Sequence, residues 1–464
     1  MQIKKLIIFY IINFILIYKH IYNKNMSIVY KLGGTSQCKI GYDRLINQIK
    51  ENLINKKQNF VVLSAVSGVT NNLVKFTETK DLKYIDIVLE LNYKLINELK
   101  LKEEKFDIIK NILLNLCQNY IKSFDISDIY EKSEIIGYGE IFSSNIFNNY
   151  IDSNYDFKFN SLTLHDSYKY IKSKKEIFQC NSTTEFYCDI HKVDLVTDDI
   201  NIFQGFIGST PSGKKVLLGR GGSDTTGSLI ANAINAKFYE VWTDVDGIYT
   251  ADPRIFSATL IDKIDYELVQ EIASMGAKVM HPLSIKPCAD KNIPIYVKNT
   301  FNNNKKGTTI TSISECRYTF WDRRFYAVQK NETVFKIKSL DMWNSVGFLN
   351  DIFRKFSENK IDVNIVTTSQ FSISATTSEQ NKYKLLELKQ ILSERYDIEM
   401  INDCTVLSIV ERNIKNILKN INFDKINTEI IHISDNNMTI NIVLRKFDTN
   451  IINHIQTLGE LIDY

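Results

Sequence analysis

The segment SIVYKLGGTS, residues 27–36, decides the fold of this chain. The segment IVYK, residues 28–31, predicts a β-strand, and the glycine pair 33–34 ends it before a helix expected over 40–55. A second strand is expected over 59–66. Short apolar runs that alternate with longer amphipathic ones are typical of βαβ units. The sequence therefore predicts an α/β fold around a mostly parallel sheet.

The same alternation continues to about residue 312. Residues 81–124 lack glycine and proline and predict helices. A further helix is expected to begin near Glu131, with Gly139 and Glu140 at its start. Further strands are expected at 202–207, 215–219, 238–242 and 293–297.

After about residue 312 the pattern changes to short β-rich runs between helices. A strand–helix–strand–strand rhythm that occurs twice predicts a pair of small ferredoxin-like modules. The helices are expected near 346–359 and 450–458, and the strands at 333–338, 362–367, 371–376, 405–410, 428–434 and 437–444.

The composition is that of a soluble globular protein of about three domains. The chain has 464 residues, of which 44% are hydrophobic and 24% charged. The formal net charge of +3 predicts no nucleic-acid partner. Seven scattered cysteines without a C-x-x-C pair argue against a zinc ribbon, a redox dithiol or a secreted disulfide framework. We therefore expect a reducing compartment, the cytoplasm.

Residues 1–26 stand apart as an apolar leader or a misassigned start. The run LIIFYIINFILIY, residues 6–18, is short for a bilayer span and resembles the apolar region of a signal peptide. A second methionine, Met26, immediately precedes the first expected strand. The alternative is a targeting or anchoring segment, which would direct the chain to an organelle or tether it to a membrane.

Two glycine-rich segments have the composition of anion sites. Lys31 followed by Gly33 and Gly34 could bind phosphate through backbone N–H donors and a lysine charge. In GRGGSDTTG, residues 219–227, Arg220 could bind a carboxylate with two parallel hydrogen bonds. Asp224 could orient a lysine or a metal-bound phosphate. The structural alternatives, a plain strand-to-helix turn and a plain glycine-rich turn, stay open on local features alone.

Three other segments contain residue types found in binding or catalytic sites. WTDVDGIYTADPR, residues 242–254, suits a nucleotide-binding loop, and it cannot be a calcium loop because Tyr249 stands where that loop requires glycine. GSTPSGKK, residues 208–215, resembles a P-loop but ends in Lys215 instead of Ser or Thr, so we expect a hairpin turn over 211–214. His281 precedes a proline and is expected to cap a helix.

The motifs occur together in one order that is highly specific. KLGGTS, LSAVSGVTN (63–71), GYGEIFSS (137–144), QGFIGS (204–209), GRGGSDTT (219–226), WTDVDGIYTADPR (242–254) and MGAKVMHP (275–282) resemble aspartate kinase of the amino-acid kinase family over the whole chain from residue 27. Residues 339–369 further resemble the ACT domains of the single-function, lysine-sensitive type.

This resemblance implies an αβα sandwich around a mostly parallel sheet, followed by two ACT domains. The implied domains are a catalytic domain over 27–312, a first ACT-like domain over 313–404, and a second over 405–464 that is shortened or interleaved with the first. The implied reaction converts L-aspartate and ATP, with Mg²⁺, to 4-phospho-L-aspartate and ADP. This is the first step of the lysine, threonine and methionine (diaminopimelate) pathway.

Residue roles are carried over from the family motifs. Lys31 and Asp224 are implied to be catalytic, with Asp224 organising the lysine. Glu140 would bind the α-ammonium group of aspartate and Arg220 its α-carboxylate, with no protein side chain assigned to the metal. The remaining aspartate contacts would be Ser64, Thr70, Gly221, Gly222 and Ser223, and the ATP contacts Lys31, Gly33, Gly34, Thr243, Asp244, Tyr249, Arg254 and Lys278.

The regulatory pocket departs from the family pattern. Lysine-sensitive relatives carry acidic residues where this chain has Asn364 and Gln370. A bound lysine would lose compensation for its ammonium groups, so we expect weak or absent lysine inhibition. The other matching pocket positions, which could still bind some regulatory amino acid, are Met342, Ser345, Phe348, Leu349, Val363 and Ser369.

Two other functions and a dimeric assembly are also considered for this chain. The first alternative is another kinase of the same fold, such as glutamate 5-kinase or acetylglutamate kinase. The second is a non-catalytic amino-acid sensor built on the ACT domains. ACT domains of this family usually pair across a dimer, so we expect a homodimer.

Overall fold

The computed structural model describes the chain in two compact units. The first contains the described residues up to Ile248, together with Leu260–Gln270 and Val279–Arg317, and the second contains the rest. The expected helix at 450–458 and the apolar run 6–18 lie outside the described residues. Described are residues 27–123, 128–155, 161–177, 184–190, 199–255, 257–276, 280–316, 324–339, 346–412 and 428–446. None of their helices combines the length and the apolarity that crossing a membrane requires.

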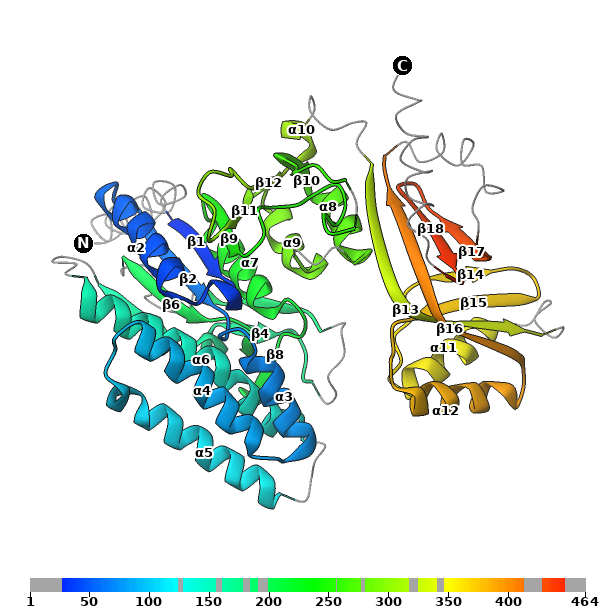
Figure 1. Ribbon diagram of the computed structural model, residues 1–464, viewed down its shortest axis with the longest axis horizontal. Helices are drawn as coiled ribbons and strands as arrows, with labels where there is room; N and C mark the ends of the chain where they lie inside the picture. The colour runs from blue at the N-terminus through cyan, green and yellow to red at the C-terminus, as the bar shows by residue number, and fades with distance from the viewer. Residues whose placement is uncertain are drawn as a thin grey trace, which may run out of the picture. The chain divides into compact units, whose positions relative to one another are not determined.

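An eight-stranded, mostly parallel sheet forms the centre of the first unit (Figure 1). Its order is β10-β12-β11-β9-β1-β2-β6-β3, and only the β11–β12 pair is antiparallel. The strands expected at 28–31, 59–66, 238–242 and 293–297 are confirmed as β1, β2, β9 and β11. The strands are β1 (Ser27–Leu32), β2 (Gln58–Leu63), β3 (Leu162–His165), β6 (Ile200–Gln204), β9 (Phe238–Thr243), β10 (Lys263–Asp265), β11 (Ile295–Asn299) and β12 (Thr308–Thr311).

The strand expected at 202–207 is two strands, which corrects the prediction. β6 ends at Gln204, and a turn follows in which the Ile207 N–H donates to the Gly205 carbonyl at 2.8 Å. Phe206 has a φ of 69°, which a continuous strand cannot accommodate. The chain therefore leaves the large sheet and enters a four-stranded sheet of order β5-β4-β7-β8. Its strands are β4 (Ile171–Ser173), β5 (Phe186–Cys188), β7 (Ile207–Ser209) and β8 (Lys215–Leu217).

The P-loop-like segment is a hairpin turn, as expected. β7 and β8 pair in antiparallel register, with Gly208 opposite Val216. The Thr210 N–H donates to the Lys214 carbonyl at 2.9 Å, and Gly213 has a φ of 88° that favours glycine. No helix follows the glycine, so the segment lacks the N-terminus that a P-loop places against phosphate.

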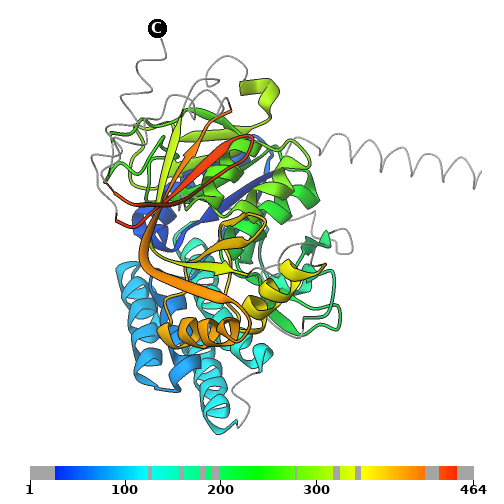
Figure 2. The ribbon, with the colours of Figure 1, turned by 90° about the vertical axis from the view of Figure 1, so that its right-hand side faces the viewer.

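Helices cover both faces of the large sheet. Because side chains alternate along a strand, Ile28, Tyr30 and Leu32 share one face of β1, where they pack in a buried core with residues of α2 and α6. Lys31 points to the opposite face, which carries α7. Figures 1 and 2 show α3, α4, α5 and α6 bundled side by side. The helices of this unit are α2 (Lys39–Ile54), α3 (Val69–Thr79), α4 (Lys83–Glu98), α5 (Asp107–Lys122), α6 (Ile129–Asn154), α7 (Gly222–Ile234), α9 (Pro282–Ala289) and α10 (Ile313–Cys316), with the 3-10 helices η1 (Gly34–Ser36), η2 (Glu103–Phe106) and η3 (Ser167–Lys169).

The position of Glu140 in its helix differs from the prediction. α6 begins at Ile129, so Gly139 and Glu140 lie near its middle, not at its start. A Cβ on Gly139 would stand 2.8 Å from the Cβ of Ala65. Glycine therefore lets the middle of α6 approach the turn that follows β2, and this approach buries Glu140 beside that turn.

The second unit contains a six-stranded antiparallel sheet of order β14-β15-β13-β16-β18-β17. The strands β13 and β16 run the length of this sheet as one pair, with register shifts around Glu332. The predicted boundary at 404/405 falls inside β16, so both ACT-like halves share these two strands, and their division stays a prediction. The elements are β13 (Phe325–Lys338), β14 (Val366–Thr368), β15 (Ser372–Thr377), β16 (Asp397–Val410), β17 (Ile430–Asp435), β18 (Thr439–Leu444), α11 (Phe348–Glu358) and α12 (Lys382–Ser393); α8 (Tyr266–Ser274) has residues in both units.

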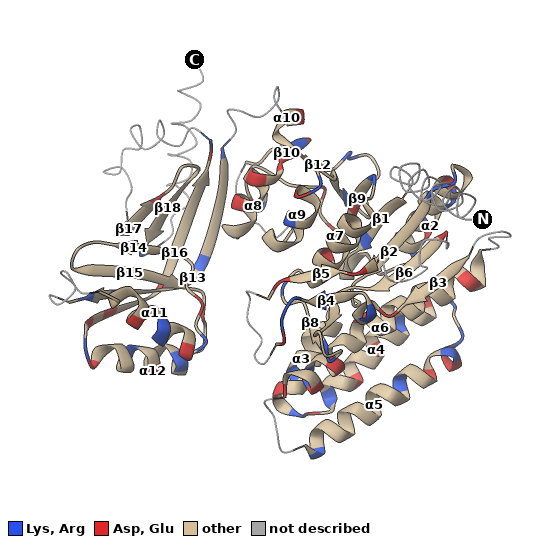
Figure 3. Cartoon of the chain, turned by 180° about the vertical axis from the view of Figure 1, so that it is seen from behind, with Lys and Arg blue, Asp and Glu red and all other residues tan. Residues whose placement is uncertain are grey.

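Surface charge is mixed in both units. Figure 3 shows basic and acidic residues interspersed along α5 and along α12. This distribution agrees with the small net charge of +3.

Candidate active site

The candidate site lies where four parallel strands end. β9, β1, β2 and β6 are neighbours, and Leu32 is in register with both Leu63 and Trp242. Their carboxyl ends therefore meet at one edge of the sheet, the usual binding edge of an open α/β sheet. The glycine pair 33–34 follows β1, Ser64 follows β2, and Asp244 follows β9.

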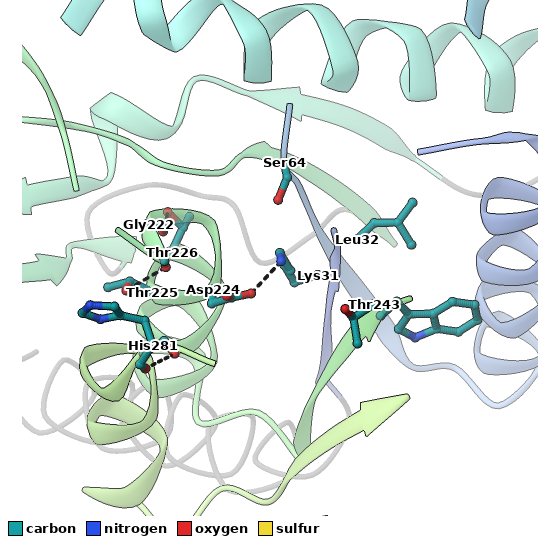
Figure 4. Close-up of polar contacts among 12 residues, drawn as sticks. Lys31, Leu32, Ser64, Gly222, Asp224, Thr225, Thr226, Thr243 and His281 are labelled. Carbon is teal, nitrogen blue, oxygen red and sulfur yellow. Dashed lines mark hydrogen bonds and ion pairs between the residues drawn. The ribbon is translucent and has the colours of Figure 1, made fainter. Parts of the chain in front are cut away.

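Lys31 and Asp224 form an ion pair at the centre of this edge. The lysine Nζ lies 2.7 Å from the Asp224 Oδ1, and the two side chains are only 11% and 14% exposed. Asp224 lies in the first turn of α7, where the helix dipole favours a negative charge. Figure 4 shows the Lys31 side chain between Ser64 and Thr243, with Asp224 opposite its tip. The structure thus brings together both residues predicted to be catalytic.

The N-terminus of α7 is packed so closely that it requires glycine. Gly221 has a φ of 65°, and a Cβ there would stand 2.3 Å from the Cβ of His281. A Cβ on Gly222 would stand equally close to the Phe206 ring. The glycines therefore let the first turn of α7 reach the sheet edge. Arg220 lies exposed directly before this turn.

His281 caps α9, as expected. Its Nδ1 accepts a hydrogen bond from the Leu283 N–H at 3.3 Å. Burial is the largest influence on the pKa of His281 and lowers it; the charge of Arg220 lowers it further, and Asp224 opposes them. A neutral imidazole whose Nδ1 already serves as a cap is poorly placed to act as a general base.

The two glycines after β1 have different roles in the structure. A Cβ on Gly34 would stand 2.7 Å from the Ala65 carbonyl oxygen, so glycine lets this loop touch the turn after β2. The Gly33 N–H donates to the Trp242 carbonyl at 2.9 Å. Gly33 was expected to offer that N–H to a phosphate. In the structure this N–H joins β1 to β9, and the part of Gly33 in an ATP site stays a prediction.

Glu140 is a buried carboxylate with one unsatisfied oxygen. The residue is 3% exposed, and its Oε1 accepts a hydrogen bond from the Ala65 N–H at 3.3 Å. Its Oε2 is buried without a hydrogen-bond partner. Burial raises the pKa of Glu140 to about 8, against the smaller opposing effect of the Ala65 N–H. Such a group is costly unless a cation compensates it, which is the environment of a ligand-binding carboxylate.

The other residues predicted to contact aspartate lie around the same edge. Ser64 is half-buried directly after β2, and Thr70 lies in the first turn of α3. Ser223 packs against the turn after β6, where a Cβ on Gly205 would stand 2.5 Å from its Oγ. The side of Lys31 next to β2 and β6 therefore holds Ser64, Thr70, Glu140 and the first turn of α7.

The predicted ATP residues are divided. Thr243 ends β9 on the other side of Lys31 and Asp244 follows it, with the Thr243 hydroxyl donating to the Asp244 Oδ1 at 3.2 Å. Tyr249 and Arg254 belong to the second unit, in which Arg254 pairs with Asp252 at 2.7 Å. The part of these two residues in an ATP site stays a prediction. Lys278 lies outside the described residues.

Sequence reasoning missed a set of buried polar residues behind the loops. Ser36 and Thr300 join their hydroxyls at 2.6 Å, which links the glycine loop to the end of β11. Gln37 and Ser143 both donate to the Ser64 carbonyl. No local pattern marks these residues, because each partner comes from a distant part of the sequence.

The predicted regulatory residues lie in the second unit, except Met342 and Ser345, which fall outside the described residues. Phe348 and Val363 belong to one apolar cluster, whereas Leu349 is 47% exposed. Asn364 is exposed and donates through its Nδ2 to the Glu332 Oε2 at 3.0 Å. Glu332 is a buried carboxylate that sequence reasoning missed. Ser369 and Gln370 are exposed in the turn between β14 and β15.

Comparison with known proteins agrees with this geometry. The sequence profile of the amino acid kinase family matches residues 26–299. Lysine-sensitive aspartokinase 3 of Escherichia coli is 30% identical over 362 residues, 75% of this chain and 78% of that protein. The aspartokinase of Chlamydia trachomatis is 32% identical over 293 residues, 61% of this chain and 64% of that protein.

A solved structure confirms the fold. Escherichia coli aspartokinase III in complex with aspartate and ADP superposes with a TM-score of 0.76 at 24% identity, covering 93% of this chain and 99% of that one. The fold and the sheet-edge site define an enzyme of the amino acid kinase family. The chain belongs to that family and, within it, to the aspartokinases. Its activity is the ATP-dependent phosphorylation of aspartate.

Proposed function

We propose that Lys31 marks the point of phosphoryl transfer, with ATP on its β9 side and L-aspartate on its β2 side. The observation that carries this assignment is the Lys31–Asp224 pair, held at 2.7 Å between the two groups of predicted contact residues. The γ-phosphate moves to the β-carboxylate, which gives 4-phospho-L-aspartate and ADP. Glu140 holds the α-ammonium group and Arg220 the α-carboxylate, so only the β-carboxylate faces ATP.

This reaction needs charge neutralisation more than a base. The side-chain carboxyl of aspartate has a pKa of about 4, so it is an ionised nucleophile at neutral pH. The obstacle is repulsion between that carboxylate and the polyphosphate. Lysine charge and backbone N–H donors lower the barrier by positioning the groups and stabilising negative charge. The role of His281 as a helix cap agrees with a site without a general base.

We propose that Mg²⁺ enters with ATP and is held mainly by its phosphates. Among the described residues, no group of three His, Cys, Asp or Glu side chains could hold a metal ion. Mg²⁺ in phosphoryl transfer keeps several waters and takes one or two protein carboxylates, so it does not require a dedicated cluster of protein ligands. When bound, the ion neutralises phosphate charge, while Lys31 and α7 supply the remaining positive potential.

Trapping of the acyl phosphate tests the proposed function. With ATP, Mg²⁺ and hydroxylamine, we expect hydroxamate from aspartate and not from glutamate. Glutamate hydroxamate would favour another amino-acid kinase specificity. A well-folded sample that forms no hydroxamate while binding an amino acid in its second unit would favour the sensor alternative.

Arg220→Lys is expected to raise the KM for aspartate about tenfold or more with a smaller change in the KM for ATP. A lysine is a point charge and cannot replace the planar fork that binds a carboxylate through two hydrogen bonds. Steady-state kinetics with each substrate varied in turn measures this effect. An unchanged aspartate KM would remove Arg220 from the aspartate site.

Lysine is expected to inhibit weakly or not at all. Each charged hydrogen bond contributes about 1.5–3 kcal/mol, so neutral Asn364 and Gln370 remove much of the affinity for a lysine ammonium. The double variant Asn364→Asp/Gln370→Glu is expected to increase lysine sensitivity in the hydroxamate assay. Saturable inhibition of the wild-type chain by sub-millimolar lysine would contradict this prediction.

We infer that the chain forms a homodimer through its second unit. β14 is an edge strand of the six-stranded sheet, and edge strands readily pair with another chain. Val366 on this strand and the neighbouring Phe371 are 39% and 43% exposed. Light scattering coupled to gel filtration would measure the mass, and a monomer at assay concentration would contradict the inference.

A further inference from the structure

Gln37 is a buried amide between the two loops of the proposed active site. It follows directly after η1 and is 5% exposed. Its Nε2 donates to the carbonyl oxygens of Leu32 at 3.4 Å and of Ser64 at 3.0 Å. Its Oε1 accepts a hydrogen bond from the Tyr42 hydroxyl at 2.7 Å. One side chain thus joins the end of β1, the turn after β2 and α2.

The partners of Gln37 determine how its amide is oriented. Leu32 and Ser64 present carbonyl oxygens, which only accept, so the NH₂ group must face them. Tyr42 is completely buried, and burial raises its pKa well above the usual value, so its hydroxyl stays protonated and donates. Its ring packs edge-on against Phe147 with 4.8 Å between the centroids. The amide therefore has one arrangement that satisfies all three contacts.

The turn after β2 is held from α6 as well. The Ser143 hydroxyl donates to the Ser64 carbonyl at 2.6 Å. Glu140, three residues earlier in α6, accepts from the Ala65 N–H at 3.3 Å. The Ser64 carbonyl therefore receives one donor from the α6 side and one from Gln37. Without Gln37 the turn would stay attached to α6, but it would lose its side-chain link to the loop after β1.

The distance between these two loops matters for the reaction. The regular β1–β2 pairing ends at Leu32 and Leu63, and one further backbone bond, from the Ser64 N–H to the Leu32 carbonyl at 3.2 Å, ties the turn after β2 to the end of β1. Beyond it, the Ser67 N–H donates to the Gly34 carbonyl at 3.2 Å. The loop after β1 lies next to Lys31, and the turn after β2 carries Ser64. With phosphate at Lys31 and aspartate at Ser64, as proposed above, this spacing would set the distance between the transferring phosphate and its acceptor.

We propose that Gln37 is a positioning residue for phosphoryl transfer, whose buried amide, together with two backbone hydrogen bonds, fixes the spacing between the glycine loop and the Ser64 turn. The inference rests on the proposed function of the site. Gln37 acts through the backbone of Leu32 and Ser64 and contacts neither substrate. A displacement of about 1 Å in a reacting group costs about 100-fold in rate, so a side chain outside the reaction centre can have a large effect.

The first test compares Gln37→Met with Gln48→Met. Methionine keeps the length of glutamine but makes none of the three hydrogen bonds. We expect Gln37→Met to lower kcat/KM for aspartate about 10- to 100-fold, with a much smaller change in the KM for ATP. Gln48 lies in α2 with only a surface bond to Glu51, so its variant should behave as wild type. Thermal unfolding of each variant shows whether the fold survives.

Two further variants keep the test decisive if Gln37→Met is unstable. Tyr42→Phe removes one oxygen and leaves the buried Gln37 Oε1 without its hydrogen-bond donor, and we expect about a severalfold loss of the same kind. In Gln37→Glu an ionised carboxylate would face the Ser64 carbonyl, whereas the protonated form donates one hydrogen bond to it. The activity of Gln37→Glu relative to wild type should therefore rise as pH falls.

The outcomes separate this inference from the proposed function. Wild-type hydroxamate formation with unchanged kinetics in Gln37→Met, or a Gln37→Glu to wild-type ratio that is flat in pH, would overturn the inference alone. Calorimetric titration with aspartate alone gives a readout without turnover, and weakened binding by Gln37→Met would support it. A wild-type chain that neither binds aspartate nor forms hydroxamate would overturn both.

Discussion

Lys31→Ala is expected to lower kcat about 10³-fold while the chain stays folded. Removing one positioned donor to developing negative charge typically costs about 10²- to 10³-fold, and Lys31 also neutralises phosphate charge. Its Nζ lies 2.7 Å from Asp224 and points away from the α2 face of β1. The KM for aspartate should change far less than kcat, because the proposed aspartate contacts lie on the β2 side. Hydroxamate formation under saturating substrates measures the effect.

The variant also leaves Asp224 without its ion-pair partner, so stability must be controlled. Breaking a buried pair by removing one partner destabilises a protein by about 3–5 kcal/mol. Lys31→Ala/Asp224→Asn removes the unpaired charge and should recover stability without recovering turnover. Lys298→Ala is a matched control, since Lys298 pairs at 2.8 Å with the buried Glu240 but has no proposed role in the reaction. Near-normal turnover of Lys31→Ala would dismiss the assignment.

Aspartate affinity is expected to fall about tenfold for each pH unit below 8. The pKa of Glu140 is raised to about 8, chiefly by burial, so the carboxyl is largely protonated at pH 7. Binding of an ammonium group requires the carboxylate, so binding must release about one proton at pH 7. Above pH 8 the affinity should level off. Calorimetry in two buffers of different ionisation enthalpy counts the protons, and the absence of proton release would contradict the role of Glu140.

Glu140→Gln should remove this pH dependence and weaken aspartate binding about 100-fold or more. The amide cannot carry the charge that compensates the α-ammonium group. The same variant should not be less stable at high pH. A carboxyl whose folded-state pKa lies above its unfolded value of about 4.5 stabilises the fold below that value, and this contribution is lost as pH rises toward 8. Glu140→Gln should therefore gain in Tm relative to wild type between pH 5 and 9.

Opposite signs for stability and binding make the Glu140 prediction specific. Replacing a residue that is needed only for packing would lower both the stability of the fold and the affinity for aspartate. Ser143, one turn further along α6, offers a comparison, because Ser143→Ala removes a hydrogen bond without removing a charge. Its aspartate affinity should keep the wild-type pH dependence. A Glu140→Gln chain with unchanged aspartate affinity would show that the buried carboxylate is structural.

Local sequence predicted the elements that depend on local chemistry. Alternating apolar residues, turn residues and capping preferences account for the strands β1, β2, β9 and β11, the hairpin between β7 and β8, and the helix cap at His281. The prediction failed where chain geometry decides. The run 202–207 reads as one strand, yet the turn at Phe206 divides it between two sheets. Glu140 was expected at a helix start, yet it lies in the middle of α6 because the helix begins at Ile129.

Motifs in a specific order identify the family of this protein and the types of residue in its site. Which of those residues meet depends on how the chain packs in three dimensions. Lys31 reaches Asp224, and Gln37 reaches Ser64, because parallel strands bring their carboxyl ends to one edge of the sheet. Packing also determines that the Gly33 N–H donates within the fold and that the Glu140 carboxyl is shielded from water. Burial and long-range pairing arise from packing between distant segments, which no local pattern encodes.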